Sequence, residues 1–333
     1  MKFGKKIISL CIAMIIMVAF FSGCGKEAGS DEEGVINLKF AMVDSETSNY
    51  YKGAQKIAEE VDAATDGKIK ISIYPNSQLG NERDCWEGAS MGTIDITTAA
   101  NSVMSAFIPE MKVLDQPYLF ATAEEAHSVI DGELGDAIAE KAEAMGIHMV
   151  GWMESGFRNV FSSRPIETIE DFEGLKIRTM ENDTHIAAFN AIGAIATPMA
   201  AGDQFTALQQ KTIEAGENAV ANVLTNNFYD VTPHITYTDH LFVFIGIGVS
   251  DTAWNKIPDD LKEPFVEAVK KGCEAQRQYL VEANEEAVDE LKKLGVTFYD
   301  IDKDTIKEKM DAALEGTKVN LNQDWLKMIE AGK

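Results

Sequence analysis

Residues 36–75 read INLKFAMVDSETSNYYKGAQKIAEEVDAATDGKIKISIYP, and this stretch contains a complete strand–helix–strand unit. Apolar and polar residues alternate over 36–42, the period-2 pattern of a strand with one buried face. Apolar residues then recur at helical spacing over 51–64, and Gly67 supplies a helix stop. Alternation returns over 69–73. Two strands joined by a helix lie parallel, so the stretch predicts an α/β fold with a parallel sheet covered by helices.

The same alternation continues along the chain. Further helices are predicted over 82–91, 124–145 and 183–192, and further strands over 94–96, 147–152, 159–162, 175–178 and 241–249. The last strand holds Gly246 and Gly248, half of a dinucleotide-binding fingerprint, but the third glycine is missing and a nucleotide site carries little weight. The longest helical pattern covers 259–294 and would span about 50 Å. That length suits a helix packed against both lobes of a two-lobed protein.

Composition narrows the function. The chain has 333 residues, 45% of them hydrophobic and 25% charged, which is typical of one large or two medium soluble domains. Its formal net charge of −24 makes binding to nucleic acid improbable, because such a surface repels phosphate. A small anionic ligand would therefore need a few arginines that form a positive pocket.

The N-terminus has the pattern of an export signal over residues 1–23. Three lysines precede the apolar run Ile7–Phe21, which is too short to span a bilayer comfortably. The sequence Ser22-Gly23-Cys24 at its end resembles a bacterial lipobox, which predicts lipidation of Cys24 and anchoring at the outer face of the cell membrane. The alternative is a plain signal peptide that contains a cysteine. Residues 24–34 are polar and predict a flexible tether.

Known catalytic and metal-binding patterns are missing from the sequence. The five histidines have no H-E-x-x-H spacing, and there is no G-x-S-x-G elbow and no P-loop. Beyond the N-terminal region the cysteines are Cys85 and Cys273, which could pair or remain two buried thiols, and their spacing predicts no zinc site. These observations indicate a protein that is not an enzyme and that has no cofactor.

Two arginines are candidate ligand-binding residues. Arg178 closes the predicted strand 175–178, and ligands of open α/β sheets gather outside the carboxyl ends of strands. Arg158 follows the strand 147–152. A guanidinium binds a carboxylate through two parallel hydrogen bonds, so both residues suit an organic acid. The alternative is that both are ordinary surface arginines.

Several motifs together give the chain a family resemblance. In chain order they are GKIKISIYP (67–75) with QLG (78–80), the segment 151–166, DFEGLKIR (171–178), GAIATPM (193–199), ALQ (207–209) with GEN (216–218), and TDH (238–240). Their order and spacing resemble the substrate-binding subunits of tripartite ATP-independent periplasmic (TRAP) transporters, often labelled dicarboxylate-binding. The resemblance covers nearly the whole mature chain.

The resemblance implies a two-lobed periplasmic-binding-protein-like fold with a hinge, crossing strands and a long shared helix. It places lobe 1 at 35–155 and 244–283, and lobe 2 at 156–243 and 284–333. Arg178 would hold the ligand carboxylate. The other implied ligand-binding residues are Arg158, Asn218, Ser45, Thr47 and Asn49 of the loop 45–49, and Asn101 of the wall 97–101.

The same resemblance limits the ligand. Ala201 and Ala100 replace a pocket aromatic and a pocket acid of sialic-acid-binding members, so sialic acid is not expected. Asn218 replaces the tryptophan of metal-assisted members, so no bridging cation is expected. C4-dicarboxylates and sugar acids remain. We therefore expect a monomeric receptor that delivers an organic acid anion to the membrane permease subunits of a TRAP transporter. The alternatives are an exported lipoprotein hydrolase and a ligand-sensing receptor with the same fold.

Overall fold

The computed structural model describes residues 34–333. The signal peptide and the lipidation of Cys24 lie outside the described residues, as does all of the tether except Gly34. In the described part of the chain, no helix combines the length and the apolar character needed to cross a membrane.

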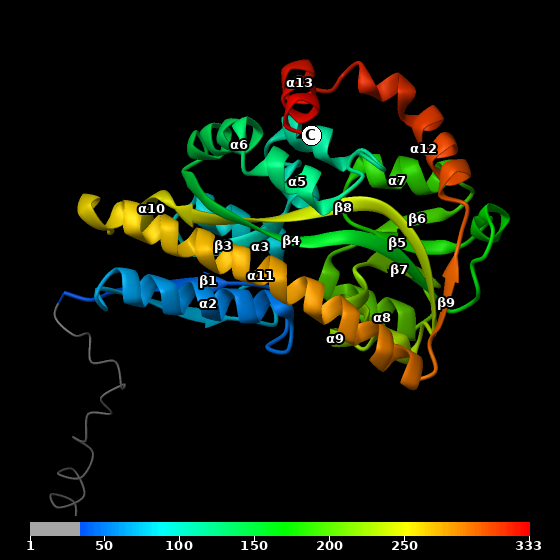
Figure 1. The fold of residues 1–333 in the computed structure, drawn as a ribbon, viewed down its shortest axis with the longest axis horizontal. Helices are drawn as coiled ribbons and strands as arrows, with labels where there is room; N and C mark the ends of the chain where they lie inside the picture. Colours follow the sequence, from blue (N-terminus) through cyan, green and yellow to red (C-terminus); the bar gives the residue numbers. More distant parts are fainter. Residues whose placement is uncertain (1–33) are drawn as a thin grey trace, which may run out of the picture. The chain divides into compact units, whose positions relative to one another are not determined.

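One nine-stranded sheet runs through the described body (Figure 1). The strands are β1 (Ile36–Ala41), β2 (Ile69–Tyr74), β3 (Ile96–Ala100), β4 (Ile147–Ser162), β5 (Lys176–Thr179), β6 (Ile195–Pro198), β7 (Ala215–Asn218), β8 (His234–Ser250) and β9 (Thr297–Asp300). Their order is β2-β1-β3-β8-β4-β7-β5-β6, and β9 pairs with β8. The long strands β4 and β8 therefore join the two halves of the sheet.

The expectation of a parallel sheet is wrong at its centre. β1 pairs in parallel with β2 and β3, and β5 with β6 and β7, but β4 and β8 are antiparallel. The predicted strands 147–152 and 159–162 are one strand, in which bulges at Glu154/Gly156 and Arg158/Val160 interrupt the register. These bulges break the period-2 pattern without ending the strand. β3 also begins later than predicted, because the N–H groups of Thr93 and Ile94 close a turn onto Gly88.

Helices cover both faces of the sheet. They are α2 (Asn49–Ala64), α3 (Glu82–Ser90), α4 (Asn101–Met104), α5 (Ala123–Ile130), α6 (Glu133–Glu143), α7 (Asp183–Ala191), α8 (Gln204–Gln209), α9 (Val220–Thr225), α10 (Asp251–Trp254), α11 (Asp259–Lys293), α12 (Lys303–Lys318) and α13 (Gln323–Gly332). Four 3₁₀ segments also lie in the described residues: η1 (Pro109–Asp115), η2 (Ile169–Phe172), η3 (Ala201–Asp203) and η4 (Phe228–Asp230).

The prediction of a single helix over 124–145 is wrong. Gly132 is extended, and its N–H reaches back to Val129, so the chain turns and α6 starts anew.

The long helix is confirmed. α11 crosses the body diagonally (Figure 1), and its first part packs into a core with Phe40 and Ile57, to which it contributes Phe265. Its last part contributes Leu280 and Leu291 to a different core, around α9 with Phe161 of β4 and Ile235 of β8. One helix therefore contacts both halves of the sheet, as a two-lobed architecture requires.

The lobe boundaries given above remain a prediction.

Gly246 and Gly248 serve packing. A Cβ atom on Gly246 would lie 2.7 Å from Met149 Cε, and one on Gly248 would lie 2.6 Å from Ile147 Cγ2. The two glycines therefore let side chains of β4 close over β8, which accounts for them without a nucleotide. Cys85 and Cys273 are both buried and both free, so they do not pair.

Candidate functional site

A pocket of about 110 Å³ forms where the loop after β1, the start of α3, the middle of β4 and the carboxyl ends of β5 and β7 meet. Its lining combines cationic, acidic and amide side chains with a few apolar ones. The polar and charged residues are Asp44, Tyr50, Glu82, Ser155, Arg158, Arg178, Gln204, Asn218, Asn222 and Asn226. Ala100 and Ala201 also line it, so the two alanines on which the expectation against sialic acid rests both lie in this pocket.

Arg158 has no donor left for a ligand among the described residues. Its Nε and Nη2 groups donate to the carboxylate of Glu217, and Nη2 also donates to the Glu217 carbonyl at 2.6 Å. Its Nη1 donates to Ser155 Oγ at 3.1 Å and to Asn218 Oδ1 at 3.0 Å. Arg158 was predicted to follow a strand, but it lies within β4 and its side chain is buried. Arg158 therefore organises the floor of the pocket.

Glu217 is the buried counter-ion of this floor. Burial disfavours its charge, but Arg158 and the nearby His240 hold the pKa of Glu217 well below its usual range. His240 Nε2 lies 3.6 Å from its carboxylate, and burial lowers the pKa of His240. The Arg158–Glu217 pair is thus internally neutral, and it adds almost no net charge to the pocket.

Arg178 is the cation that still has donors. Its Nε and Nη2 groups donate to the Met199 carbonyl at 3.0 and 2.8 Å. Its Nη1 is 3.8 Å from Glu217 Oε1 and makes no hydrogen bond within residues 34–333. Burial lowers the pKa of Arg178 to about 10, with Glu217 opposing, so the guanidinium is charged at neutral pH. A carboxylate in the pocket can therefore pair with Nη1.

Amide groups extend this donor set. Asn218 Oδ1 accepts hydrogen bonds from Arg158 and from Asn222 Nδ2 (2.8 Å). Because the amide oxygen points toward these two donors, the amide nitrogen of Asn218 points away from them. Asn222 Nδ2 also donates to Tyr50 Oη at 3.0 Å. Gln204 Nε2 and Asn222 Oδ1 are buried and have no partner among the described residues. Buried polar atoms of this kind are costly unless a ligand or water satisfies them.

The structure brings only some of the predicted residues together. Arg158, Arg178 and Asn218 line one pocket, whereas the other four lie outside its lining. Ser45 and Thr47 share a hydroxyl contact of 3.0 Å on the loop before α2. Asn49 accepts from Gln276, and Asn101 donates to Asp115 and accepts from the backbone of Phe244. Their side chains are used within the fold.

Sequence reasoning missed Asp44, Tyr50, Glu82, Gln204 and Asn222. Only Asp44 carried a usable signal, because it follows the carboxyl end of a predicted strand. The other four lie on helices, and the local sequence of a helix does not predict where it packs on the sheet.

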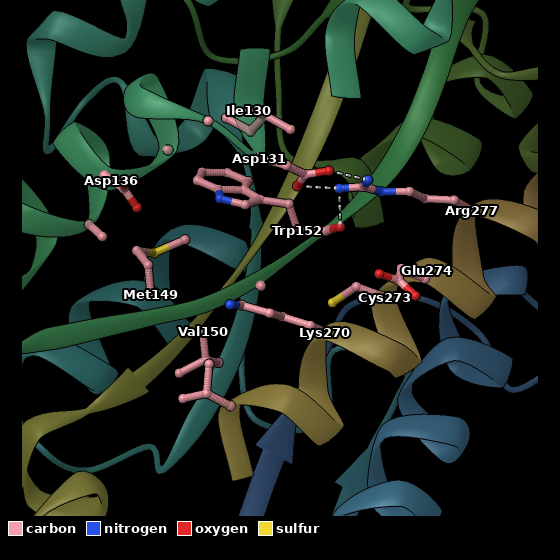
Figure 2. A pocket seen from close by; sticks show the side chains of 15 residues that line it. Ile130, Asp131, Asp136, Met149, Val150, Trp152, Lys270, Cys273, Glu274 and Arg277 are labelled. Atoms are coloured by element: carbon pink, nitrogen blue, oxygen red, sulfur yellow. Dashed lines mark hydrogen bonds and ion pairs between the residues drawn. The ribbon is translucent and has the colours of Figure 1, made fainter. Parts of the chain in front are cut away.

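A larger cavity of about 370 Å³ lies between α6, β4 and α11, and Figure 2 shows its side chains. Its cations are already paired. Arg277 donates to both oxygens of Asp131 at 2.6 and 2.9 Å and to the Trp152 carbonyl at 3.1 Å. Lys270 donates to Glu267 at 3.1 Å. Arg277 Nε has no partner in the described chain, but Asp131 already pairs with both terminal nitrogens of this guanidinium. The cavity therefore has no guanidinium open to a ligand carboxylate as Arg178 is in the smaller pocket.

The described body combines one sheet, two long crossing strands and a charged pocket beside them, an arrangement that suits the binding of a small polar solute. Residues 40–320 match the model of the family "Bacterial extracellular solute-binding protein, family 7", and the chain belongs to that family. A solute-binding protein of Verminephrobacter eiseniae is 34% identical over 263 residues, which cover 78% of each chain. Membership confirms the family resemblance and the two-lobed fold, and it does not favour the hydrolase alternative.

Solved structures agree with this assignment. The sugar acid binding protein of Advenella mimigardefordensis, in complex with galactonate, is 28% identical with a TM-score of 0.86, covering 90% of this chain and 98% of that one. A TRAP periplasmic solute-binding protein of Polaromonas bound to D-erythronate is 32% identical with a TM-score of 0.84, covering 89% and 98%.

Proposed function

We propose that this protein is an extracytoplasmic receptor that binds a small organic acid anion and delivers it to a TRAP permease. The observation that carries the proposal is the free Nη1 of Arg178 in a pocket with unpartnered amide groups. Charge-assisted hydrogen bonds contribute about 1.5–3 kcal/mol each, and a micromolar ligand needs about 8 kcal/mol in total. One carboxylate and a few further polar contacts are therefore sufficient.

A sugar acid is the ligand class that we propose first. Galactonate and D-erythronate, the ligands of the two structures compared above, each combine one carboxylate with several hydroxyl groups. The pocket matches that composition, because one guanidinium has free donors and most of the other polar groups can exchange hydrogen bonds with hydroxyls. Bidentate pairing would orient the carboxylate, and the amides would bind the rest of the ligand.

A thermal-shift screen tests the proposal. A ligand at 100 times its Kd stabilises the folded state by about 2.7 kcal/mol, so a matching acid should raise the melting temperature by several degrees. The panel contains galactonate, D-erythronate, hexuronates, C4-dicarboxylates and sialic acid, with the neutral sugar alcohols of the same carbon skeletons as controls. A melting temperature that no acid changes, or that a neutral alcohol raises as much, would contradict an acid receptor.

Cys24 is the proposed attachment point to the membrane. The Ser22-Gly23-Cys24 junction supports this proposal, and two or three acyl chains on one residue would anchor the protein firmly. Cys24→Ala is therefore expected to release the protein from membranes or to block its processing, and detergent partitioning with N-terminal sequencing measures both. Cys11→Ala, inside the signal, is the control. A mutant that partitions like the wild type with an unchanged mature N-terminus would contradict lipidation.

A further inference from the structure

Two carboxyl groups line the same pocket as Arg178. Asp44 lies in the loop after β1, and Glu82 is the first residue of α3. Glu82 Oε1 accepts a hydrogen bond from the N–H of Ala100 at 2.9 Å. Within residues 34–333 no other side-chain hydrogen bond is made by Glu82, and the Asp44 carboxyl makes none with another residue. Both groups therefore present acceptor oxygens to a ligand.

With both acids ionised, the pocket has one more negative than positive charge before any ligand binds. Arg158 is neutralised by Glu217, which leaves Arg178 as the one positive charge among the described lining residues, opposite the acids Asp44 and Glu82. This arrangement can accept one ligand carboxylate at Arg178. A second carboxylate would have to lie near Asp44 or Glu82, and like charges at short range in a buried site repel strongly.

We infer that Asp44 and Glu82 form the specificity-determining wall of the pocket. They accept hydrogen bonds from the hydroxyl groups of a monocarboxylate, and they exclude a ligand with a second carboxylate. This exclusion becomes stronger as the pH rises. The inference rests on the proposed function, because it presumes that an acid anion pairs with Arg178. It concerns which acid the receptor selects, since a dicarboxylate and the matching sugar acid differ at only one carbon.

The pH dependence follows from the surroundings of the two acids. Burial and repulsion from Glu82 raise the pKa of Asp44 to about 7, and burial raises the pKa of Glu82 as well. The charged and titratable groups that act on the pair are Tyr50 of α2, Arg158 of β4, Arg178 of β5 and Glu181 after β5. Glu217 of β7 lies beside Arg158, and His240 of β8 lies beside Glu217.

Protonation would change what the wall tolerates. Below pH 7 a protonated Asp44 carries no charge and can donate a hydrogen bond to a second carboxylate. Above pH 7 Asp44 is ionised. Binding of a dicarboxylate then either requires the uptake of one proton or is weakened by repulsion between the second carboxylate and Asp44. One coupled proton changes affinity by about tenfold per pH unit. A monocarboxylate has a hydroxyl at this position and needs no proton, so its affinity does not fall in this way as the pH rises.

Two matched ligand pairs test the inference by calorimetry. D-erythronate and meso-tartrate share a carbon skeleton, as do galactonate and galactarate, and each pair differs only in a terminal CH₂OH or carboxylate. Between about pH 6 and about pH 8.5 the ratio of dicarboxylate Kd to monocarboxylate Kd should rise by roughly 30-fold. In Asp44→Asn the ratio should stay constant with pH, and the dicarboxylate should bind more tightly than to the wild type at high pH.

Glu46→Gln is the control, because Glu46 is an exposed acid on the same loop and does not line the pocket. It should keep the pH dependence of the wild type. A ratio that does not change with pH, a pH dependence that survives in Asp44→Asn, or tighter binding of the dicarboxylate at high pH would overturn the inference and leave the receptor function standing. If no acid of the whole panel binds, the proposed function itself fails.

Discussion

Arg178→Ala is expected to weaken binding of the organic acid by about 2–5 kcal/mol, which corresponds to roughly a 30-fold to 5,000-fold higher Kd. The mutation removes the only guanidinium in the described pocket that still has free donors, and it leaves the ligand carboxylate desolvated without a partner. Arg158 cannot substitute, since Glu217, Ser155 and Asn218 occupy all of its donors. Calorimetric titration of the wild type and the variant measures the loss.

Arg178→Lys should recover only part of the affinity. An ammonium restores the charge but cannot reproduce the planar fork of the guanidinium. Arg164→Ala serves as a control, because Arg164 follows β4 and lies outside the pocket lining. Both Arg178 variants also lose the hydrogen bonds to Met199, so their unfolding is measured without ligand to separate stability from recognition. Equal affinity in folded wild type, Arg178→Ala and Arg178→Lys would contradict a binding role.

Glu217→Gln is expected to destabilise the folded protein by about 3–5 kcal/mol at pH 7, because it leaves Arg158 as a buried charge without its counter-ion. The effect should depend on pH with a defined sign. The pKa of Glu217 is lowered in the folded state, so its contribution is fully present above the pKa of the unfolded chain, about 4.3. It is lost as the pH falls toward the lower folded-state pKa. The difference between wild type and variant should therefore narrow below about pH 4.

Urea unfolding at pH 7 and in acid measures this difference. Glu170→Gln is a matched control, since Glu170 is exposed and forms no ion pair within the described chain, and it should change stability by less than about 0.5 kcal/mol at either pH. Replacing both partners, as in Arg158→Met with Glu217→Leu, should cost less than Glu217→Gln alone, because Arg158 is then no longer a buried charge without its counter-ion. A variant as stable as the wild type at pH 7 would show that the pair contributes nothing to folding.

Local periodicity in the sequence is sufficient to predict several of the helices and strands. Strand β1, helices α2 and α3 and the 35-residue helix α11 follow directly from alternation or from the 3.6-residue repeat. The sequence also offered Arg158 and Arg178 together as candidate ligand-binding residues, because both lie near the ends of predicted strands. Short bulges and turns distort these periods over only two or three residues. For that reason the continuity of β4 and the break between α5 and α6 were predicted incorrectly.

Only the tertiary structure decided which arginine is free to bind. Arg158 and Arg178 look alike in the sequence, but Glu217, 59 residues after Arg158, pairs with Arg158 through β4–β7 contact and leaves Arg178 with open donors. The placement of Asp44 and Glu82 in the same pocket as Arg178 is likewise a product of the assembled sheet. A local pattern records which face of an element is buried, whereas pairing of charges depends on distances between residues far apart in the chain, and folding alone sets those distances.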